Sequence, residues 1–337
     1  MPFRIPVRTG HGVWTDREGV LVRLVDEAGS VSFGEAAPVL SFQMESVDEI
    51  EAACRQLGPE VDPARLDLVP AGLPCLRNAL GAALHPAPLA EGKFRILAAL
   101  LPAGRPAVTQ LKEKAESGFR VFKWKVGVGD LTEELGLLDD VCAALPSDGK
   151  LRLDANGAWD RRKAERWLER CAERPVEFVE QPAFVSAHES ATQRARTDDL
   201  LLGLAQSFPT PIALDESIVG ARDLERWLGL GWPGIFVVKP SLLGDIEAAL
   251  AQLRKWKSDV VFSSALETAV GAQAALRSAF AWEAPTIGPT PTLPRALGFG
   301  VWPLFDDARL NGPSLAPYLR SDDVERINPG AAWNALS

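Results

Sequence analysis

The chain has little cysteine and histidine and no long apolar segment, and each shortage excludes a class of protein. Its four cysteines are scattered without a CxxC pair: Cys54, Cys75, Cys142 and Cys171. This spacing favours free thiols in a reducing compartment over a disulfide framework. None of the three histidines lies beside the acidic residues considered below, so a histidine-rich zinc site is not expected.

Targeting and membrane signals are also missing. No run approaches the roughly 18 consecutive apolar residues of a membrane span. The N-terminus has neither the basic region nor the apolar core of a signal peptide. We therefore expect a cytoplasmic protein without a membrane partner.

Positive charge is in the minority, with 36 Lys and Arg against 45 Asp and Glu, for a formal net charge of −9. A surface of that sign disfavours nucleic acid and anionic membranes as main partners. If the substrate is an anion, a local positive site or a metal ion must overcome the overall field. The oligomeric state stays open, and a monomer is compatible with the sequence.

Residues 1–93 predict an α+β domain. Residues 19–26 and 30–35 read as a pair of antiparallel strands joined by a turn. A capping box, Ser46 to Glu49, starts an amphipathic helix that Gly58 ends, and a second helix is expected over residues 76–84. Strands followed by helices favour a separate domain of this class.

Residues 94–301 predict a barrel, because strands and helices alternate there and the strands are continuous apolar runs, as parallel strands buried on both faces require. After Ala284 the chain is rich in proline and glycine, which leaves no room for an ordinary eighth helix. We expect a barrel that closes on a short strand. The tail, residues 302–337, should pack back on the N-terminal domain.

Two lysines one residue apart, Lys123 and Lys125, end one of the predicted barrel strands. Strand side chains alternate, so both project to the same face. Neighbouring ammonium groups disfavour each other's charge, and the pKa of the less solvated lysine should therefore fall toward the range of a general base. The pair predicts a proton-abstracting lysine, although alone it would also fit a solvated strand edge.

Four further charged residues end later apolar runs: Asp154, Glu180, Asp215 and Lys239. From Lys125 onward the steps are 24 to 35 residues, against roughly 30 for a strand and helix unit of such a barrel. Active sites of this fold lie at the carboxyl ends of the strands, so these side chains should converge there. Each carboxylate alone could instead cap a helix.

Three carboxylates without an imidazole favour a hard cation, Mg²⁺ with Mn²⁺ as a substitute. We predict Asp154, Glu180 and Asp215 as its ligands, with Lys125 and Lys239 facing each other across it. Removing a proton α to a carboxylate creates an enediolate, whose barrier falls only if positive charge is already in place. The expected substrate is a small carboxylate.

Four more positions near these strand ends have two interpretations each. Arg152 is either an ion-pair partner or a substrate contact. Asn156 is either a turn residue or part of the site. Ser263 and Ser264 end the seventh strand, where polar residues face either the substrate or a turn.

Five motifs together resemble the muconate-lactonising-enzyme branch of the enolase superfamily: Lys123-Trp-Lys125, Leu153-Asp-Ala-Asn-Gly157, Val179-Glu-Gln-Pro182, Leu214-Asp-Glu-Ser217 and Val238-Lys-Pro240. Gly34-Glu35-Ala-Ala-Pro38 resembles the signature of that branch's capping domain. Within the branch the chain is most similar to the o-succinylbenzoate synthase family. The similarity spans nearly the whole chain.

The resemblance implies a modified TIM barrel, (β/α)7β, with an α+β capping domain formed from the N-terminus and the C-terminal tail. It also implies a lyase of menaquinone or phylloquinone biosynthesis that removes water from 2-succinyl-6-hydroxy-2,4-cyclohexadiene-1-carboxylate. By analogy, Lys125 removes the α-proton and then protonates the departing hydroxyl on the same face, while Lys239 stabilises the enediolate by its charge. Lys123 is a further substrate-binding or supporting candidate.

Three alternatives remain. A dipeptide epimerase or an N-acylamino-acid racemase would use the same scaffold, lysines and metal. Epimerases of this branch carry an Asp-X-Asp at the eighth strand, and the stretch Gly288 to Gly300 contains no acid. A barrel that binds without turnover is the third alternative, which the complete set of lysines and carboxylates disfavours.

Overall fold

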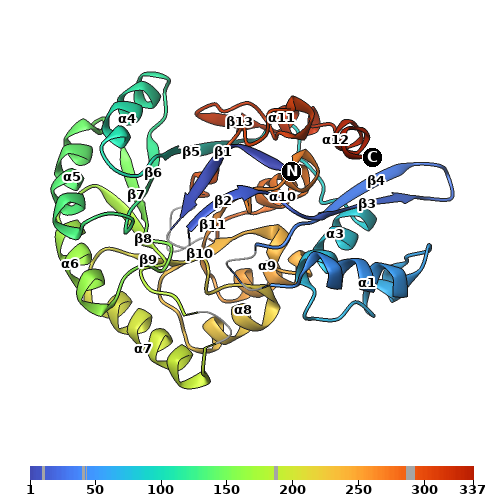
Figure 1. The fold of residues 1–337 in the computed structure, drawn as a ribbon, viewed down its shortest axis with the longest axis horizontal. Coiled ribbons are helices and arrows are strands. Elements are labelled where there is room, and N and C mark those ends of the chain that lie inside the picture. Colours follow the sequence, from blue (N-terminus) through green and yellow to red (C-terminus); the bar gives the residue numbers. More distant parts are fainter. Residues whose placement is uncertain (10–11, 40–41, 43, 186–188, 286–292) are drawn as a thin grey trace.

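The computed structural model describes residues 1–9, 12–39, 42, 44–185, 189–285 and 293–337. Its centre is a ring of eight strands, seen in Figure 1 with the helices around it. The strands pair in parallel in the order β11, β10, β9, β8, β7, β6, β5, β12. A parallel bridge between Ser263 and Gly298 joins the two ends of this series and closes the ring. The strands are β5 (Phe94–Leu101), β6 (Val121–Lys125), β7 (Lys150–Asp154), β8 (Val176–Glu180), β9 (Ile212–Leu214), β10 (Ile235–Val238), β11 (Asp259–Phe262) and β12 (Leu297–Gly300).

A helix follows each of the first seven barrel strands and packs on the outside of the ring. These helices are α4 (Pro106–Glu116), α5 (Leu131–Ala144), α6 (Arg161–Cys171), α7 (Ala191–Ser207), α8 (Gly220–Gly229), α9 (Ile246–Lys255) and α10 (Ala269–Ala281). A single turn of 3₁₀ helix, η2 (Pro240–Leu242), precedes α9. In the described part of the chain no helix follows β12 directly, so the predicted (β/α)7β architecture is confirmed.

The apolar strand residues that point outward make the core between strands and helices. Trp124 of β6 is fully buried and lies edge-on to Trp167 of α6, with 6.2 Å between their ring centroids. Trp167 in turn stacks on Trp159 at 5.2 Å. Trp124 therefore packs in the core, as expected, and its two lysine neighbours are directed the other way.

The described residues of the N-terminal segment form two antiparallel strand pairs and three helices. They are β1 (Pro2–Thr9), β2 (Gly12–Asp16), β3 (Val20–Val25), β4 (Val31–Ala36), α1 (Val47–Leu57), α2 (Pro63–Leu66) and α3 (Pro74–Leu84). The predicted β3 and β4 pair is present, and the capping box of Ser46 and Glu49 starts α1 as expected. The hairpin of β1 and β2 was not predicted. The segment from Val39 to Met44 lies partly outside the described residues.

The tail after β12 contacts both the N-terminal segment and the barrel. It forms η3 (Ala308–Leu310), β13 (Tyr318–Arg320), α11 (Ser321–Glu325) and α12 (Pro329–Leu336). Phe305 stacks on Phe3 at 5.6 Å, and Trp333 lies 6.0 Å from Phe33. β13 pairs antiparallel with β5 of the barrel. The domain limits at residues 93 and 301 stay a prediction.

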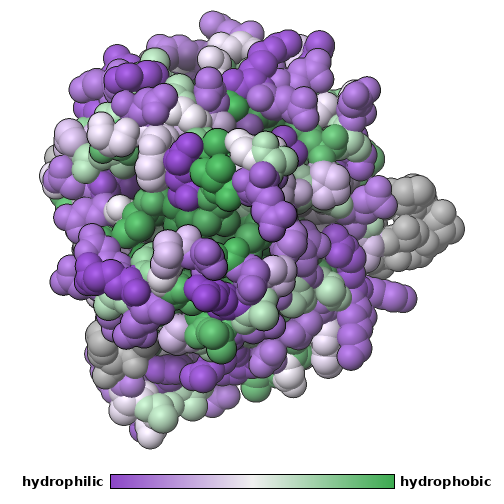
Figure 2. Space-filling view, turned by 90° about the vertical axis from the view of Figure 1, so that its right-hand side faces the viewer, coloured by the Kyte–Doolittle hydropathy of each residue, from purple (hydrophilic) through white to green (hydrophobic). Residues whose placement is uncertain are grey.

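The face that carries β3, β4 and α3 has apolar side chains gathered in a hollow (Figure 2). A cavity of about 550 Å³ opens between β4, α3, α10 and the start of α12, with Phe33, Val270 and Pro329 in its wall. Among the described residues no helix is long and apolar enough to cross a membrane.

Candidate active site

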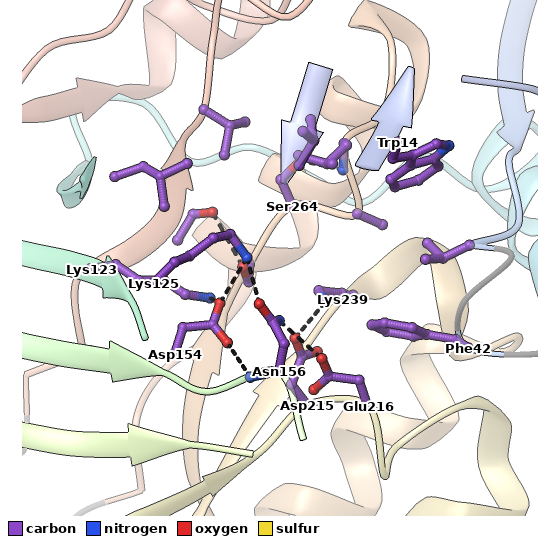
Figure 3. Close-up of a pocket in the computed structure, with 18 of the residues that line it drawn as sticks. Trp14, Phe42, Lys123, Lys125, Asp154, Asn156, Asp215, Glu216, Lys239 and Ser264 are labelled. Carbon is purple, nitrogen blue, oxygen red and sulfur yellow. Dashed lines mark hydrogen bonds and ion pairs between the residues drawn. The ribbon is translucent and has the colours of Figure 1, made fainter. Parts of the chain in front are cut away.

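A pocket of about 400 Å³ opens at the carboxyl ends of the barrel strands. One side of its wall is charged and carries Lys123, Lys125, Asp154, Asp215 and Lys239 (Figure 3). The other side is apolar and comes largely from the N-terminal segment: Val7, Val13, Trp14, Val39 and Phe42. A charged barrel mouth under an apolar cover therefore encloses the site.

Strand register explains why the charged residues meet. Lys125 is the residue of β6 opposite Asp154 of β7, and Asp154 is opposite Glu180 of β8. Because side chains alternate along each strand, three neighbouring strands present these groups on the inner face at one level. Asp215 follows β9 directly, and Lys239 follows β10.

The lysines form ion pairs with the predicted ligands. Lys123 Nζ lies 2.6 Å from Glu180 Oε1 and 3.0 Å from Asp154 Oδ2. Lys125 Nζ lies 3.4 Å from the same Asp154 oxygen. On the opposite side, Lys239 Nζ lies 2.6 Å from Asp215 Oδ2 and 4.5 Å from the ring centroid of Phe42. Neither flanking amine faces outward to water.

The expected fall in pKa within the lysine pair is wrong for Lys123. Burial alone would lower its pKa, but the charges of Asp154, Glu180 and Asp215 outweigh burial and raise it. The sequence argument counted only the repulsion between two ammonium groups. Asp154 and Glu180 lie within 3.0 Å of the Lys123 ammonium and dominate its electrostatic environment.

Burial and neighbouring charges shift the pKa values of two of these carboxylates. Burial, together with the neighbouring charges of Asp154 and Asp215, raises the pKa of Glu180 to about 8. Burial would also raise the pKa of Asp154, but Lys123 and Lys125 outweigh it and hold the pKa below its ordinary value. Asp215 Oδ1 is a buried acceptor without a hydrogen-bond partner in the described structure.

The residue types at this site suit a bound cation, but their positions in the structure do not form a complete metal site. Asp154 and Asp215 help to raise the pKa of the buried Glu180, and one oxygen of Asp215 has no hydrogen-bond partner. A divalent cation with oxygen ligands would relieve both conditions. Among the described residues, however, no three acidic, histidine or cysteine side chains form a cluster that could hold a metal ion as they stand. Lys123 instead lies between Asp154 and Glu180. Ligation by Asp154, Glu180 and Asp215 stays a prediction.

The helix-capping alternative fails for all three carboxylates. The side chain of Asp160 caps α6, and that of Ser190 caps α7. The N-terminal residue of α8 is preceded by Val219, which makes no side-chain cap. Asp154, Glu180 and Asp215 all lie upstream of these positions and are at most 3% exposed.

Asn156 belongs to the charged wall rather than to a simple turn. Its Oδ1 accepts a hydrogen bond from Lys125 Nζ at 2.8 Å, and its Nδ2 donates to Glu216 Oε1 at 3.0 Å. Its φ of 45° places it in the left-handed region, which asparagine tolerates better than most residues. Asn156 thus links Lys125 to the segment that carries Asp215.

Arg152 lies below the pocket and is not part of its wall. Its Nε donates to Glu177 Oε2 at 2.7 Å, and Nη1 donates to the carbonyl of Ala296 at 2.8 Å. The guanidinium also covers the ring of Phe178, 4.9 Å from its centroid. Of the two interpretations of Arg152, the geometry supports the ion pair.

Ser263 and Ser264 line the pocket, but their hydroxyls are already engaged. Ser263 Oγ donates to the carbonyl of Gly298 at 3.2 Å, and Ser264 Oγ donates to Glu267 Oε2 at 2.6 Å. Glu267 also accepts from Ser241 Oγ at 2.8 Å, so it ties the ends of β10 and β11 together. Sequence analysis missed Glu267 because a single acid after a strand has no distinctive spacing.

Sequence analysis also missed the cover supplied by β1 and β2. Trp14 lies in the pocket wall and packs edge-on against Phe3, with 5.3 Å between centroids. The alternation of Phe3, Ile5 and Val7 is a strand signal, and it could have revealed this hairpin.

Comparisons with known proteins agree with this architecture. Residues 107–306 match the family model described as "Enolase C-terminal domain-like". The match covers more than half of the chain, which therefore belongs to the enolase superfamily.

Individual relatives show to which family of the superfamily the chain belongs. The chain is 38% identical to the o-succinylbenzoate synthase of Thermosynechococcus vestitus over 89% of each protein. It is 31% identical to that of Thermobifida fusca, over 99% of this chain and 93% of the relative. A crystal structure of o-succinylbenzoate synthase from Thermosynechococcus elongatus, complexed with Mg in the active site, aligns with a TM-score of 0.78 and 34% identity, over 99% of this chain and 96% of that one. Within the superfamily, the chain belongs to the o-succinylbenzoate synthase family.

Proposed function

We propose that this protein is a lyase that dehydrates 2-succinyl-6-hydroxy-2,4-cyclohexadiene-1-carboxylate to o-succinylbenzoate and water. The observation that carries the proposal is the meeting of Lys125, Lys239, Asp154 and Asp215 from four strand ends in one partly apolar pocket. Glu180, from a fifth strand end, is ion-paired to Lys123 of the pocket wall. Family membership supports the same reaction. The expected pathway is menaquinone or phylloquinone biosynthesis, and the cytoplasmic location expected from four free cysteines belongs to the same proposal.

Lys125 acts first as the base. In its neutral form, Nζ takes the proton from the ring carbon that bears the carboxylate, and the electrons of that C–H bond move into the carboxylate. The electrons then return to form the ring double bond as the C–O bond to the hydroxyl breaks. The same nitrogen, now an ammonium, gives its proton to the leaving hydroxyl, which departs as water and leaves an aromatic ring.

One nitrogen can serve both steps only if it stays on one face of the ring. Lys125 Nζ is held from the side by Asn156 Oδ1 at 2.8 Å, which limits its movement. Lys239, across the pocket, places a second positive charge beside the substrate carboxylate. Preorganised charge of this kind stabilises the enediolate without reorganisation during the reaction.

We propose that Asp154, Glu180 and Asp215 hold Mg²⁺, with Mn²⁺ as a substitute. When bound, the ion would supply a Lewis acid that stabilises extra negative charge on a substrate carboxylate. Lys123, between Asp154 and Glu180, holds these two carboxylates together and balances their charge when no ion is bound. A bound cation would take over this charge balance. The apolar wall formed by the N-terminal segment suits the hydrocarbon ring of the substrate.

The epimerase alternative conflicts with the end of the barrel. The positions of β12 that line the pocket are Gly298 and Gly300. A Cβ at Gly298 would lie 2.6 Å from Ser263 Oγ, and one at Gly300 would lie 2.1 Å from the carbonyl oxygen of Ala98. Neither position has room for the aspartate that would hold a substrate ammonium. A racemase without that requirement remains the second candidate.

The test is ultraviolet detection of the aromatic product from the purified full chain. We expect formation of o-succinylbenzoate that stops with EDTA and returns with Mg²⁺. Lys125→Ala should abolish it, whereas Lys163→Ala, at an exposed lysine of α6, should match the wild type. Equal turnover by wild type and Lys125→Ala would refute the base assignment. Absence of turnover in the wild type, with racemisation of an N-succinylamino acid, would favour the second candidate.

A further inference from the structure

Gln181 follows Glu180 directly and is fully buried, yet it touches neither the pocket nor any lysine of the site. Its φ of 39° lies in the left-handed region. A non-glycine residue held there costs of order 1 kcal/mol or more and persists only when its surroundings fix it. The neighbours of Gln181 must therefore hold its backbone in this conformation, directly beside a predicted metal ligand.

The side-chain amide of Gln181 uses its full hydrogen-bonding capacity. Oε1 accepts from the backbone N–H of Asp215 at 2.9 Å and from that of Ser217 at 3.2 Å. Nε2 donates to the carbonyl of Ala183 at 2.8 Å and to Ser217 Oγ at 2.7 Å. The orientation of the amide is unambiguous, because two N–H donors require the oxygen and a carbonyl requires the nitrogen.

The bond to Asp215 replaces a missing part of the sheet. β9 is only three residues long, Ile212–Leu214. Its ladder with β8 ends at the pair of Glu180 and Ala213, and its ladder with β10 ends at Leu214. The backbone of Asp215 therefore lies beyond both ladders. The Gln181 side chain supplies the acceptor that a longer neighbouring strand would otherwise provide.

The backbone of Gln181 also forms hydrogen bonds to the segments on both sides. Its N–H donates to the carbonyl of Ala213 at 2.8 Å, and its carbonyl accepts from Gly157 at 2.7 Å. One residue thus connects the ends of β7, β8 and β9, and each of these strands carries or precedes one predicted metal ligand. The spacing between Glu180 and Asp215 depends on it.

We infer that Gln181 is a positioning residue that sets the Asp215 carboxylate relative to Glu180 and so prepares the cation site. The inference rests on the proposed function, because it assumes that Asp215 is a ligand. Gln181 would not contact the ion or the substrate. If its role were purely structural, Gln181 would hold three loops together, and its replacement would not change the affinity for the cation.

The test titrates Mg²⁺ into the purified full chain by calorimetry, without substrate, and records the melting temperature of each variant. Gln181→Met keeps the side-chain length but loses all four hydrogen bonds. Ser217→Ala is the matched control, since it removes the Nε2 to Oγ bond of the same cluster and leaves the Asp215 bond intact. Removing the support of a metal ligand typically weakens metal binding 10- to 100-fold, and we expect about that loss for Gln181→Met and less than about threefold for Ser217→Ala.

If Gln181→Met does not fold, Gln181→Glu replaces it, because its carboxylate keeps the acceptor for Asp215 N–H, while it loses the two donor bonds and adds a negative charge. Its affinity for Mg²⁺ should stay within about fivefold of wild type even if its melting temperature falls. A tenfold loss in Gln181→Glu would contradict the inference. So would unchanged affinity in Gln181→Met, or an equal loss in Ser217→Ala. If the wild-type protein binds no Mg²⁺, the proposed cation site itself is refuted. If the wild type and Gln181→Met bind Mg²⁺ equally well, only the role of Gln181 is refuted.

Discussion

Replacing Lys123 by methionine tests whether positive charge holds the carboxylates of the site together. The Lys123 side chain is 14% exposed, and its two partners, Asp154 and Glu180, are each 2% exposed. At 3.0 Å and an effective dielectric constant of about 20, attraction to the ionised Asp154 alone would reach about 6 kcal/mol. Desolvation of the ammonium offsets part of this.

Removing one partner of a buried ion pair costs about 3–5 kcal/mol, because the other charge stays buried without compensation. We therefore expect Lys123→Met to lower the free energy of unfolding by about that amount in EDTA. Lys163→Met, at an exposed lysine, should change it by less than about 0.5 kcal/mol. Urea unfolding monitored by circular dichroism measures both.

The same experiment with Mg²⁺ gives the sharper result. A cation that binds only the folded protein at 100 times its dissociation constant adds about 2.7 kcal/mol of stability. Because Lys123→Met removes an ammonium that competes with the cation, Mg²⁺ should stabilise this variant more than the wild type. Equal stabilisation of both proteins, or a loss below about 1 kcal/mol in EDTA, would refute this account of the charge balance.

Three further predictions concern the barrel. Arg152→Met should lower the free energy of unfolding by about 3–5 kcal/mol, because Glu177 loses its buried partner; denaturant unfolding at neutral pH measures this, and a change under 1 kcal/mol would contradict it. Burial would raise the pKa of Glu177, but Arg152 and Arg295 outweigh burial and hold the pKa below 4.5 in the folded protein. The Glu177 carboxylate therefore stabilises the fold above about pH 4.5, and this contribution is lost as the pH falls through the pKa of the folded protein. The gap in melting temperature between wild type and Glu177→Gln should accordingly shrink from pH 6 toward pH 3, and calorimetry showing a constant gap would disprove the assignment. Gly300→Ala should fail to fold or melt far below wild type, since its Cβ would lie 2.1 Å from the Ala98 carbonyl oxygen, whereas Gly229→Ala in α8 has nothing within 4 Å and should fold normally.

The barrel could be predicted from the sequence because its signals repeat. Continuous apolar strands ending in charged residues recur at a nearly constant interval, and the proline-rich stretch after Ala284 marks where the pattern stops. The capping box at Ser46 and Glu49 is similarly local, and the structure has the predicted helix there. Local and periodic signals of this kind depend on few long-range contacts.

The parts that could not be predicted depend on contacts between distant segments. The pKa of Lys123 is set by Asp154 and Glu180, which lie 31 and 57 residues away in the chain, and only their distances show that attraction outweighs repulsion between lysines. Glu267 acts through hydrogen bonds between strand ends, which no spacing reveals. The two interpretations of Arg152 could be separated only once Glu177 was located.

The central claim is that Asp154, Glu180 and Asp215 bind one divalent cation between Lys125 and Lys239, and a crystal structure of the protein grown with Mg²⁺ tests it most directly. The account predicts one octahedral ion with an oxygen of each carboxylate at about 2.1 Å. An ion bound elsewhere, or Lys123 still bridging Asp154 and Glu180 with no ion beside them at saturating Mg²⁺, would contradict it.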